Sequence, residues 1–240
     1  MIYSDAPVKF KKGKLLSGIV YPEFFPLTEN DTVLNVGCGD GVQALVYDGQ
    51  FKSMVGVDIN PVSLATARAL ADYYHYKNYE LIQADVEAMP LAERFDKIIA
   101  IDIIEHVIHP QAVLKEISRL LADGGQALIT FPAMHDKWEK FFRFIGRVIL
   151  RRRGRTTVKK GWDPDVHQYD YSLAQWLRLA EQSGLKLKAC RASTLWPPLH
   201  YLGLPRFWFA NKIIHRLDKF FCQRKYLKNF GQSLVCVFEK

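Results

Sequence analysis

The sequence has little cysteine and no long apolar run. Its four cysteines are far apart, and no two of them form a CxxC pair. This excludes a disulfide framework and a zinc site of ordinary spacing, and it favours a reducing, cytoplasmic compartment. No segment has the roughly 18 uncharged apolar residues of a membrane-spanning helix, and the N-terminal segment lacks the apolar run of a signal peptide. We therefore expect a cytoplasmic protein that is soluble or peripheral at the inner face of a membrane.

Acidic residues are scarce in two segments that carry the positive charge of the chain. The net charge is +8 over 240 residues. Residues 133–161 contain ten Lys or Arg and two acids, residues 205–230 contain seven and one, and the remainder is mildly acidic. The length suits one large domain. We predict a single domain over residues 1–240, with a ligand-binding core at 32–132 and two basic amphipathic insertions at 133–168 and 195–230.

Short apolar runs alternate with helical patterns along the chain. The expected elements are strand 32–36, helix 42–47, strand 54–57, helix 62–76, strand 79–84, strand 95–101, helix 110–121, strand 126–131, helix 172–183, strand 185–192 and strand 233–238. Gly124 and Gly125 are expected to end the helix that precedes them. Strands without a polar face that alternate with helices predict an α/β fold, with a parallel sheet covered by helices on both faces.

A glycine-rich turn follows the first expected strand, at Gly37-Cys38-Gly39-Asp40-Gly41. Glycine lets the backbone approach a ligand closely, and ligands bind at the carboxyl edge of an open parallel sheet. Acidic residues end the next three strands at that edge. These are Asp58, which suits ribose hydroxyls, Asp85 beside Val86, and Asp102 after Ile101. A plain strand-to-helix turn is the alternative for the glycine cluster taken alone.

Five segments together resemble the successive motifs of class I methyltransferases that depend on S-adenosylmethionine (SAM). They are VLNVGCGDG (33–41), VGVDIN (55–60), ADVEAMP (84–90), FDKIIAIDIIEHV (95–107) and LLADGGQALITFP (120–132), in the usual order and at the usual intervals. Val42 occupies the place of the third glycine of GxGxxG, which disfavours a nicotinamide-dependent dehydrogenase. The resemblance implies a Rossmann-like, seven-stranded, mostly parallel sheet whose last strand is antiparallel.

The resemblance also implies where SAM binds and where S-adenosylhomocysteine remains as the product. The amino acid portion would lie over Gly37–Gly41, the ribose hydroxyls on Asp58, and the adenine near Ile59, Asp85 and Val86. The expected cofactor-binding residues are therefore Asn35, Gly37, Cys38, Gly39, Asp40, Gly41, Asp58, Ile59, Asn60, Asp85, Val86, Ile101 and Asp102.

The loop after the fourth strand carries the expected catalytic residue. His106 would face the methyl group in this fold, and an oxygen nucleophile is helped by a general base. A histidine that only holds the loop by hydrogen bonds is the alternative. Asp102, Glu105 and His106 also form a D-x-x-E-H cluster, similar to the E-x-x-E-H of ubiquinone-biosynthesis O-methyltransferases. A divalent metal on these three residues is a weaker hypothesis.

Both insertions have the pattern of amphipathic helices with a cationic side, such as Phe141, Ile145 and Ile149 opposite Arg143 and Arg147. The resemblance favours methyl transfer to an oxygen of a small or lipid-like acceptor (a quinone, glycolipid or envelope precursor), with the insertions on an anionic membrane. A substrate lid with solvated charges is an alternative use of the helices. An RNA or tRNA methyltransferase and a non-catalytic SAM-binding regulatory protein are alternative functions.

Overall fold

The computed structural model describes residues 22–47, 49–132, 169, 171–193 and 233–240, together with positions 144, 145, 148, 217, 220–222 and 224. Apart from these single positions, the two predicted basic insertions lie outside the described residues. Within the part of the chain that is described, no helix has both the length and the apolar character needed to cross a bilayer.

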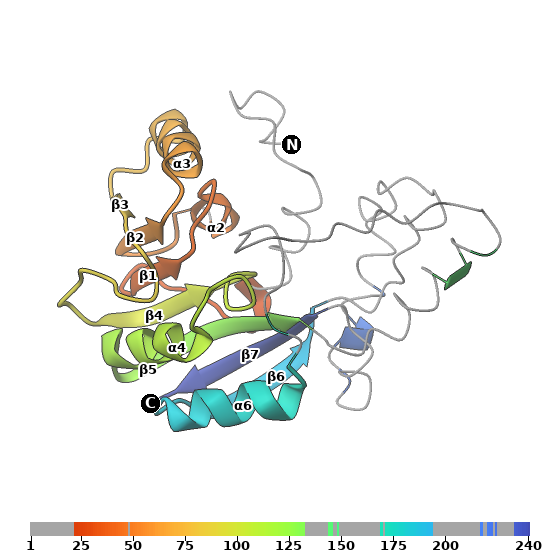
Figure 1. The fold of residues 1–240 in the computed structure, drawn as a ribbon. Coiled ribbons are helices and arrows are strands. Elements are labelled where there is room, and N and C mark those ends of the chain that lie inside the picture. The colour runs from red at the N-terminus through yellow and green to blue at the C-terminus, as the bar shows by residue number, and fades with distance from the viewer. Residues whose placement is uncertain are drawn as a thin grey trace.

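One seven-stranded sheet organises the described residues (Figure 1). The elements are β1 (Thr32–Val36), α2 (Val42–Val46), β2 (Ser53–Asp58), α3 (Pro61–Tyr73), β3 (Tyr79–Gln83), β4 (Phe95–Ala100), α4 (Pro110–Leu120), β5 (Leu121–Pro132), α6 (Leu173–Gln182), β6 (Lys186–Ala192) and β7 (Ser233–Glu239). The strand order is β3-β2-β1-β4-β5-β7-β6. All neighbouring strands are parallel except β7, which runs antiparallel between β5 and β6. The predicted fold, with its antiparallel last strand, is confirmed.

Alternate residues of the strands supply two apolar cores, one on each face of the sheet. On β4, Ile98 packs with α4 and α6, whereas the next residue, Ile99, packs with α2 and Phe25. Helices therefore cover both faces, as predicted. Because the central strands are buried on both sides, most of their residues are apolar and do not alternate strictly with polar ones.

Helices α3 and α6 begin where their sequences provide caps. The side chain of Asn60 accepts hydrogen bonds from the backbone N–H groups of Val62 and Ser63, and Pro61 occupies the first turn of α3. Ser172 and Gln175 form a capping box at the start of α6. Both helix starts agree with the sequence prediction within one residue.

The prediction for Gly124 and Gly125 was wrong. Helix α4 ends at Leu120, and β5 begins at the next residue, so both glycines lie inside the strand. Phe95 pairs with Leu121 and Lys97 pairs with Gln126, which leaves extra residues on β5 at an irregularity in the register. Gly124 has a φ of +79° there, a conformation that glycine adopts without strain.

Candidate cofactor and active site

A cavity of about 540 Å³ lies at the carboxyl ends of β1, β2, β3 and β4. Strands β2 and β4 lie on opposite sides of β1, so this is the point where the direction of the strand order changes, the usual ligand site of an open α/β sheet. Among the residues predicted for the site, those that line the cavity are Asn35, Gly37, Cys38, Gly39, Asp40, Asp58, Ile59, Asn60, Asp85, Val86, Ile101, Asp102 and His106. Gly41 and Glu105 are not in its lining.

The glycine turn after β1 is held open by left-handed backbone and by Asp58. Gly37 and Gly39 have φ values of +66° and +52°, where a side chain would be strained. The backbone N–H of Gly39 donates to Asp58 Oδ2 at 2.8 Å, and Asn60 N–H donates to Asp58 Oδ1 at 2.8 Å. Each carboxylate oxygen keeps a second lone pair. Asp58 therefore fixes the turn and can still accept hydrogen bonds from ribose hydroxyls.

Gly39 fits a ligand that contacts the backbone closely. A Cβ built on Gly39 would meet no protein atom within 4 Å, although this residue lines the cavity. A Cβ on Gly37, in contrast, would lie 2.6 Å from Cγ1 of Ile103. The space beside Gly39 is thus cavity, and the space beside Gly37 is filled by the loop after β4. This supports a bound group over the middle of the turn, as the amino acid portion of SAM requires.

Gly41 contributes to packing beside the cavity. It has a φ of +76°, and a Cβ there would lie 2.9 Å from the Cβ of Ala67 on α3. The absent side chain therefore lets the turn and α3 approach each other. This packing accounts for a glycine at position 41 without any ligand. A ligand contact of Gly41 stays a prediction.

Cys38 lies in the turn and its side chain is buried. Its side chain packs against the Tyr79 hydroxyl in the space left by Gly56. Burial, followed by the negative charge of Asp58, raises the pKa of the Cys38 thiol to about 12. The thiolate is therefore not populated at neutral pH.

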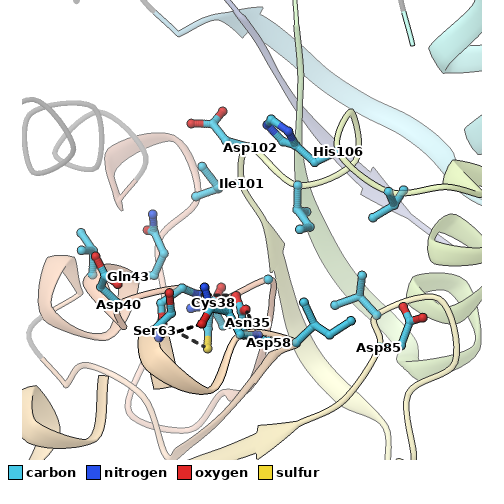
Figure 2. A pocket seen from close by; sticks show the side chains of 18 of the residues that line it. Asn35, Cys38, Asp40, Gln43, Asp58, Ser63, Asp85, Ile101, Asp102 and His106 are labelled. Carbon is cyan, nitrogen blue, oxygen red and sulfur yellow. Dashed lines mark hydrogen bonds between the residues drawn. The ribbon is translucent and has the colours of Figure 1, made fainter. Parts of the chain in front are cut away.

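The loop after β4 forms the opposite wall of the cavity, and Figure 2 places Asp102 and His106 there, across from Asp58. Asp102 has a φ of +53°, which is rare for a residue other than glycine. The buried hydroxyl of Thr130 holds it twice: it accepts from Asp102 N–H at 2.8 Å and donates to Asp102 Oδ1 at 3.2 Å. This anchor fixes the start of the loop that carries His106.

The D-x-x-E-H cluster does not assemble into a metal site. Within the described ranges, no group of three or more His, Cys, Asp or Glu side chains is placed to hold a metal ion. Glu105 is 4% exposed and lies outside the cavity lining. Burial raises its pKa to about 8, whereas a metal ligand must be ionised. Glu105, three residues after Asp102, is buried away from the cavity, so the three side chains do not surround one point.

The raised pKa of Glu105 predicts a pH-dependent stability. Between pH 4.5 and about 8 the folded protein keeps a proton that the unfolded chain loses, so stability falls as pH rises through this window. Glu105→Gln preserves the neutral shape and should remove this decline. We expect the melting temperature of the wild type to fall relative to that of Glu105→Gln from pH 5 to pH 8.5. The exposed Glu80→Gln serves as the control, and parallel curves for wild type and Glu105→Gln would contradict the assignment.

Seven further residues line the cavity without having been predicted: Val42, Gln43, Ser63, Glu87, Ile103, Val107 and Ile108. Glu87, Ile103 and Val107 lie inside the recognised motifs, but their residue types gave no sign of a role. Gln43 and Ser63 lie in the first turns of α2 and α3, beside the strand ends. Their position next to the glycine turn and Asp58 was a signal that could have identified them.

These features define an α/β fold with a ligand cavity at the carboxyl edge of its sheet, and comparisons with known proteins identify its family. A family model described as "Methyltransferase domain" matches residues 27–161, which is more than half of the chain. The chain therefore belongs to the class I SAM-dependent methyltransferases, and it is an enzyme that uses SAM. The resemblance seen in the sequence is confirmed, and the non-catalytic alternative is not supported.

Relatives in sequence are named methyltransferases, and solved structures share the fold. The ubiquinone biosynthesis O-methyltransferase of Acinetobacter baylyi is 28% identical over 78% of this chain and 76% of its own length. The (S)-coclaurine N-methyltransferase of Papaver somniferum is 22% identical over 86% of this chain, which spans only 65% of that relative. A SAM-dependent methyltransferase structure from Clostridium acetobutylicum has a TM-score of 0.59 at 14% identity, covering 98% and 93% of the two chains. The [4+2]-cyclase SpnF has a TM-score of 0.63 at 16% identity, covering 99% and 85%.

If Asp58 both holds the turn and binds the ribose, as predicted, its removal should cause a measurable loss of cofactor affinity. Asp58→Ala leaves cofactor hydroxyls without an acceptor and releases the N–H of Gly39. The cost of about 1–3 kcal/mol corresponds to a roughly 5-fold to 150-fold weaker binding of SAM, measured by calorimetry. Asp72→Ala, which removes an exposed carboxylate of α3, should bind SAM normally. Unchanged affinity in Asp58→Ala would reject the assignment.

Proposed function

We propose that this enzyme transfers the methyl group of SAM to an oxygen atom of a small or lipid-like acceptor, with His106 as the general base. The observation that carries the proposal is that His106 lines the same cavity as the glycine turn and Asp58, on the opposite wall. SAM supplies an electrophilic methyl group on a sulfonium sulfur. The protein must then position the acceptor in line and remove its proton.

The relatives support an oxygen acceptor more than a nitrogen acceptor. Several of them are named ubiquinone biosynthesis O-methyltransferases and are 28–29% identical to this chain, whereas the N-methyltransferase is 22% identical. Transfer to nitrogen is therefore the second candidate. Its acceptor would be an amine, which needs no strong base once it is unprotonated.

A labelling experiment tests the proposed acceptor. The protein is incubated with SAM carrying an isotopic methyl group and, in parallel, with an extracted lipid fraction, a polar metabolite fraction and RNA. We expect the label in an apolar product, bound as a methyl ether, which mass spectrometry identifies. Label recovered in RNA or in a methylated amine would overturn the proposal and favour one of the alternatives.

The basic insertions predict reversible binding to an anionic membrane. Each Lys or Arg near such a surface contributes about 1 kcal/mol, and the apolar faces add burial among the lipid headgroups. Phe144 and Val148, two described positions of the first insertion, are well exposed. Changing Phe141, Phe142, Ile145 and Ile149 to serine should abolish co-sedimentation with anionic liposomes.

RNA binding would use the charges of this segment but not its apolar side chains. An RNA gel shift at the same ionic strength should therefore be unaffected by the four serines. Replacing Arg151, Arg152 and Arg153 should weaken both kinds of binding, more strongly at low salt, where these charges are least screened. Tight RNA retention without any liposome sedimentation would contradict the membrane proposal and promote the RNA alternative.

A further inference from the structure

Glu87 joins two walls of the cavity that are far apart in sequence. It follows β3 by four residues and lines the cavity beside Asp85 and Val86. Its Oε1 accepts hydrogen bonds from the backbone N–H of Ile108 at 2.7 Å and of His109 at 2.9 Å. Its Oε2 lies 2.7 Å from Nδ1 of His109. The loop after β3 is thereby fastened to the end of the loop after β4.

This carboxylate is ionised and only partly exposed. The Glu87 side chain is 16% exposed, whereas that of His109 is 71% exposed. Burial raises the pKa of Glu87, but hydrogen bonds from His109 and Ile108 outweigh burial, so the net effect lowers the pKa. A carboxylate that accepts several N–H groups forms stronger hydrogen bonds than a neutral acceptor. The contact therefore survives as a fixed link at neutral pH.

The loop that carries His106 is anchored at both of its ends. Thr130 holds Asp102 at the start, as described above, and Glu87 holds Ile108 and His109 at the end. Between these anchors, the backbone N–H of His106 donates to the carbonyl of Ile103 at 2.9 Å. The position of His106 in the cavity thus depends on both anchors.

The same glutamate is also linked to the predicted adenine wall. The backbone N–H of Glu87 donates to Oδ1 of Asp85 at 2.9 Å. A ligand that contacts Asp85 and Val86 would therefore act on the backbone from which the Glu87 side chain extends. A continuous series of hydrogen bonds runs from Asp85 through Glu87 to Ile108.

A second set of hydrogen bonds holds the loop after β3 further along the chain. Arg119 of α4 donates to the carbonyl of Leu91 at 2.8 Å and to that of Met89 at 3.2 Å, and Glu116 accepts from Met89 N–H at 3.0 Å. These contacts hold the loop after β3 against α4 but do not reach Ile108 or His109. They offer a comparison in which the same loop is loosened without touching the His106 loop directly.

We propose that Glu87 is a positioning residue that couples cofactor binding at Asp85 and Val86 to the placement of the loop carrying His106. The proposal rests on the cofactor site and the role of His106 proposed above. A ligand bound at Asp85 and Val86 restricts the motion of Glu87, and Glu87 in turn restricts the motion of the end of the His106 loop. The coupling works through backbone hydrogen bonds, so it needs no movement of a helix or domain.

Amide exchange measured by NMR, residue by residue, tests the link in the full-length protein without any acceptor. In wild type, S-adenosylhomocysteine should slow exchange of the Ile108 and His109 amides. In Glu87→Ala these two amides should exchange about 10-fold or more faster without ligand, and the ligand should no longer protect them. Glu87→Gln keeps one carbonyl acceptor and should restore part of the protection.

Two controls separate positioning from a general loosening of the fold. Glu93→Ala removes an exposed carboxylate of the same loop and should behave as wild type. Arg119→Ala should loosen Met89 and Leu91 while leaving the Ile108 and His109 amides protected. If Arg119→Ala accelerates these two amides as much as Glu87→Ala does, or if Glu87→Ala leaves them protected, the proposal is overturned.

Calorimetry on the same samples distinguishes a failure of the proposed cofactor site from a failure of the proposed coupling. If wild type does not bind S-adenosylhomocysteine, the proposed cofactor site is wrong. The amide exchange of Ile108 and His109 without ligand still tests whether Glu87 holds them. If the ligand binds to wild type but does not protect Ile108 and His109, the coupling is overturned while the cofactor site stands.

Discussion

Gly39→Ala is expected to bind SAM about 100-fold or more weakly than wild type while still folding. The added methyl group meets no protein atom within 4 Å, so it enters the cavity at the place proposed for the amino acid portion of the cofactor. The φ of +52° adds a backbone penalty of about 1 kcal/mol. Calorimetry with SAM, together with a thermal melt, measures both effects.

Gly124 provides a matched control for this variant. It also has a left-handed backbone, with a φ of +79°, and a Cβ there would again meet nothing within 4 Å. Gly124→Ala should lower the melting temperature by a similar amount and leave SAM affinity unchanged. Equal loss of affinity in the two variants would mean that the cavity at Gly39 does not hold the cofactor.

His106→Ala is expected to lower turnover about 100-fold or more, with SAM affinity within about 2-fold of wild type. The side chain lines the cavity on the loop held by Asp102, across from the glycine turn. Its loss removes a base without disturbing the turn that is proposed to bind the cofactor. Turnover is measured with the acceptor that the labelling experiment identifies.

His106→Gln separates the base from a residue that only holds the loop. Glutamine can donate and accept hydrogen bonds, but it does not take up a proton near neutral pH. We expect His106→Gln to be as inactive as His106→Ala. Activity restored by glutamine would assign His106 a structural role, and full activity in both variants would remove it from the mechanism.

The order of elements could be predicted because the physical signals are local. Apolar runs that are buried on both faces mark the central strands, and Asn60 followed by Pro61 marks a helix start. The antiparallel direction of β7 was predicted only from the family resemblance. Its place between β5 and β6 was not predicted, because 40 residues separate the end of β6 from the start of β7. Gly124 and Gly125 were misjudged because a glycine pair fits a helix end and a strand irregularity equally well.

The candidate site was predictable to the extent that residue type reveals chemistry. A glycine that must leave space and an acid at a strand end are recognisable, and they do gather around one cavity. Glu87 was missed because its partners, Ile108 and His109, are about twenty residues away, and its role depends on which way its side chain turns. Glu105 was wrongly considered as a metal ligand for a similar reason. The spacing of the D-x-x-E-H cluster does not reveal that its side chain is buried outside the cavity.

The place of β7 between β5 and the edge strand β6 has a consequence for the order in which the molecule can fold. Among the described strands, β7 alone pairs with β6 and with the second edge of β5, so both stay without these partners until β7 is synthesised. An uncovered, apolar strand edge readily pairs with another chain. The nascent protein therefore passes through an interval of aggregation risk that ends when its last strand docks. A chaperone that shields the open edge of β5 during this interval should raise the yield of native enzyme.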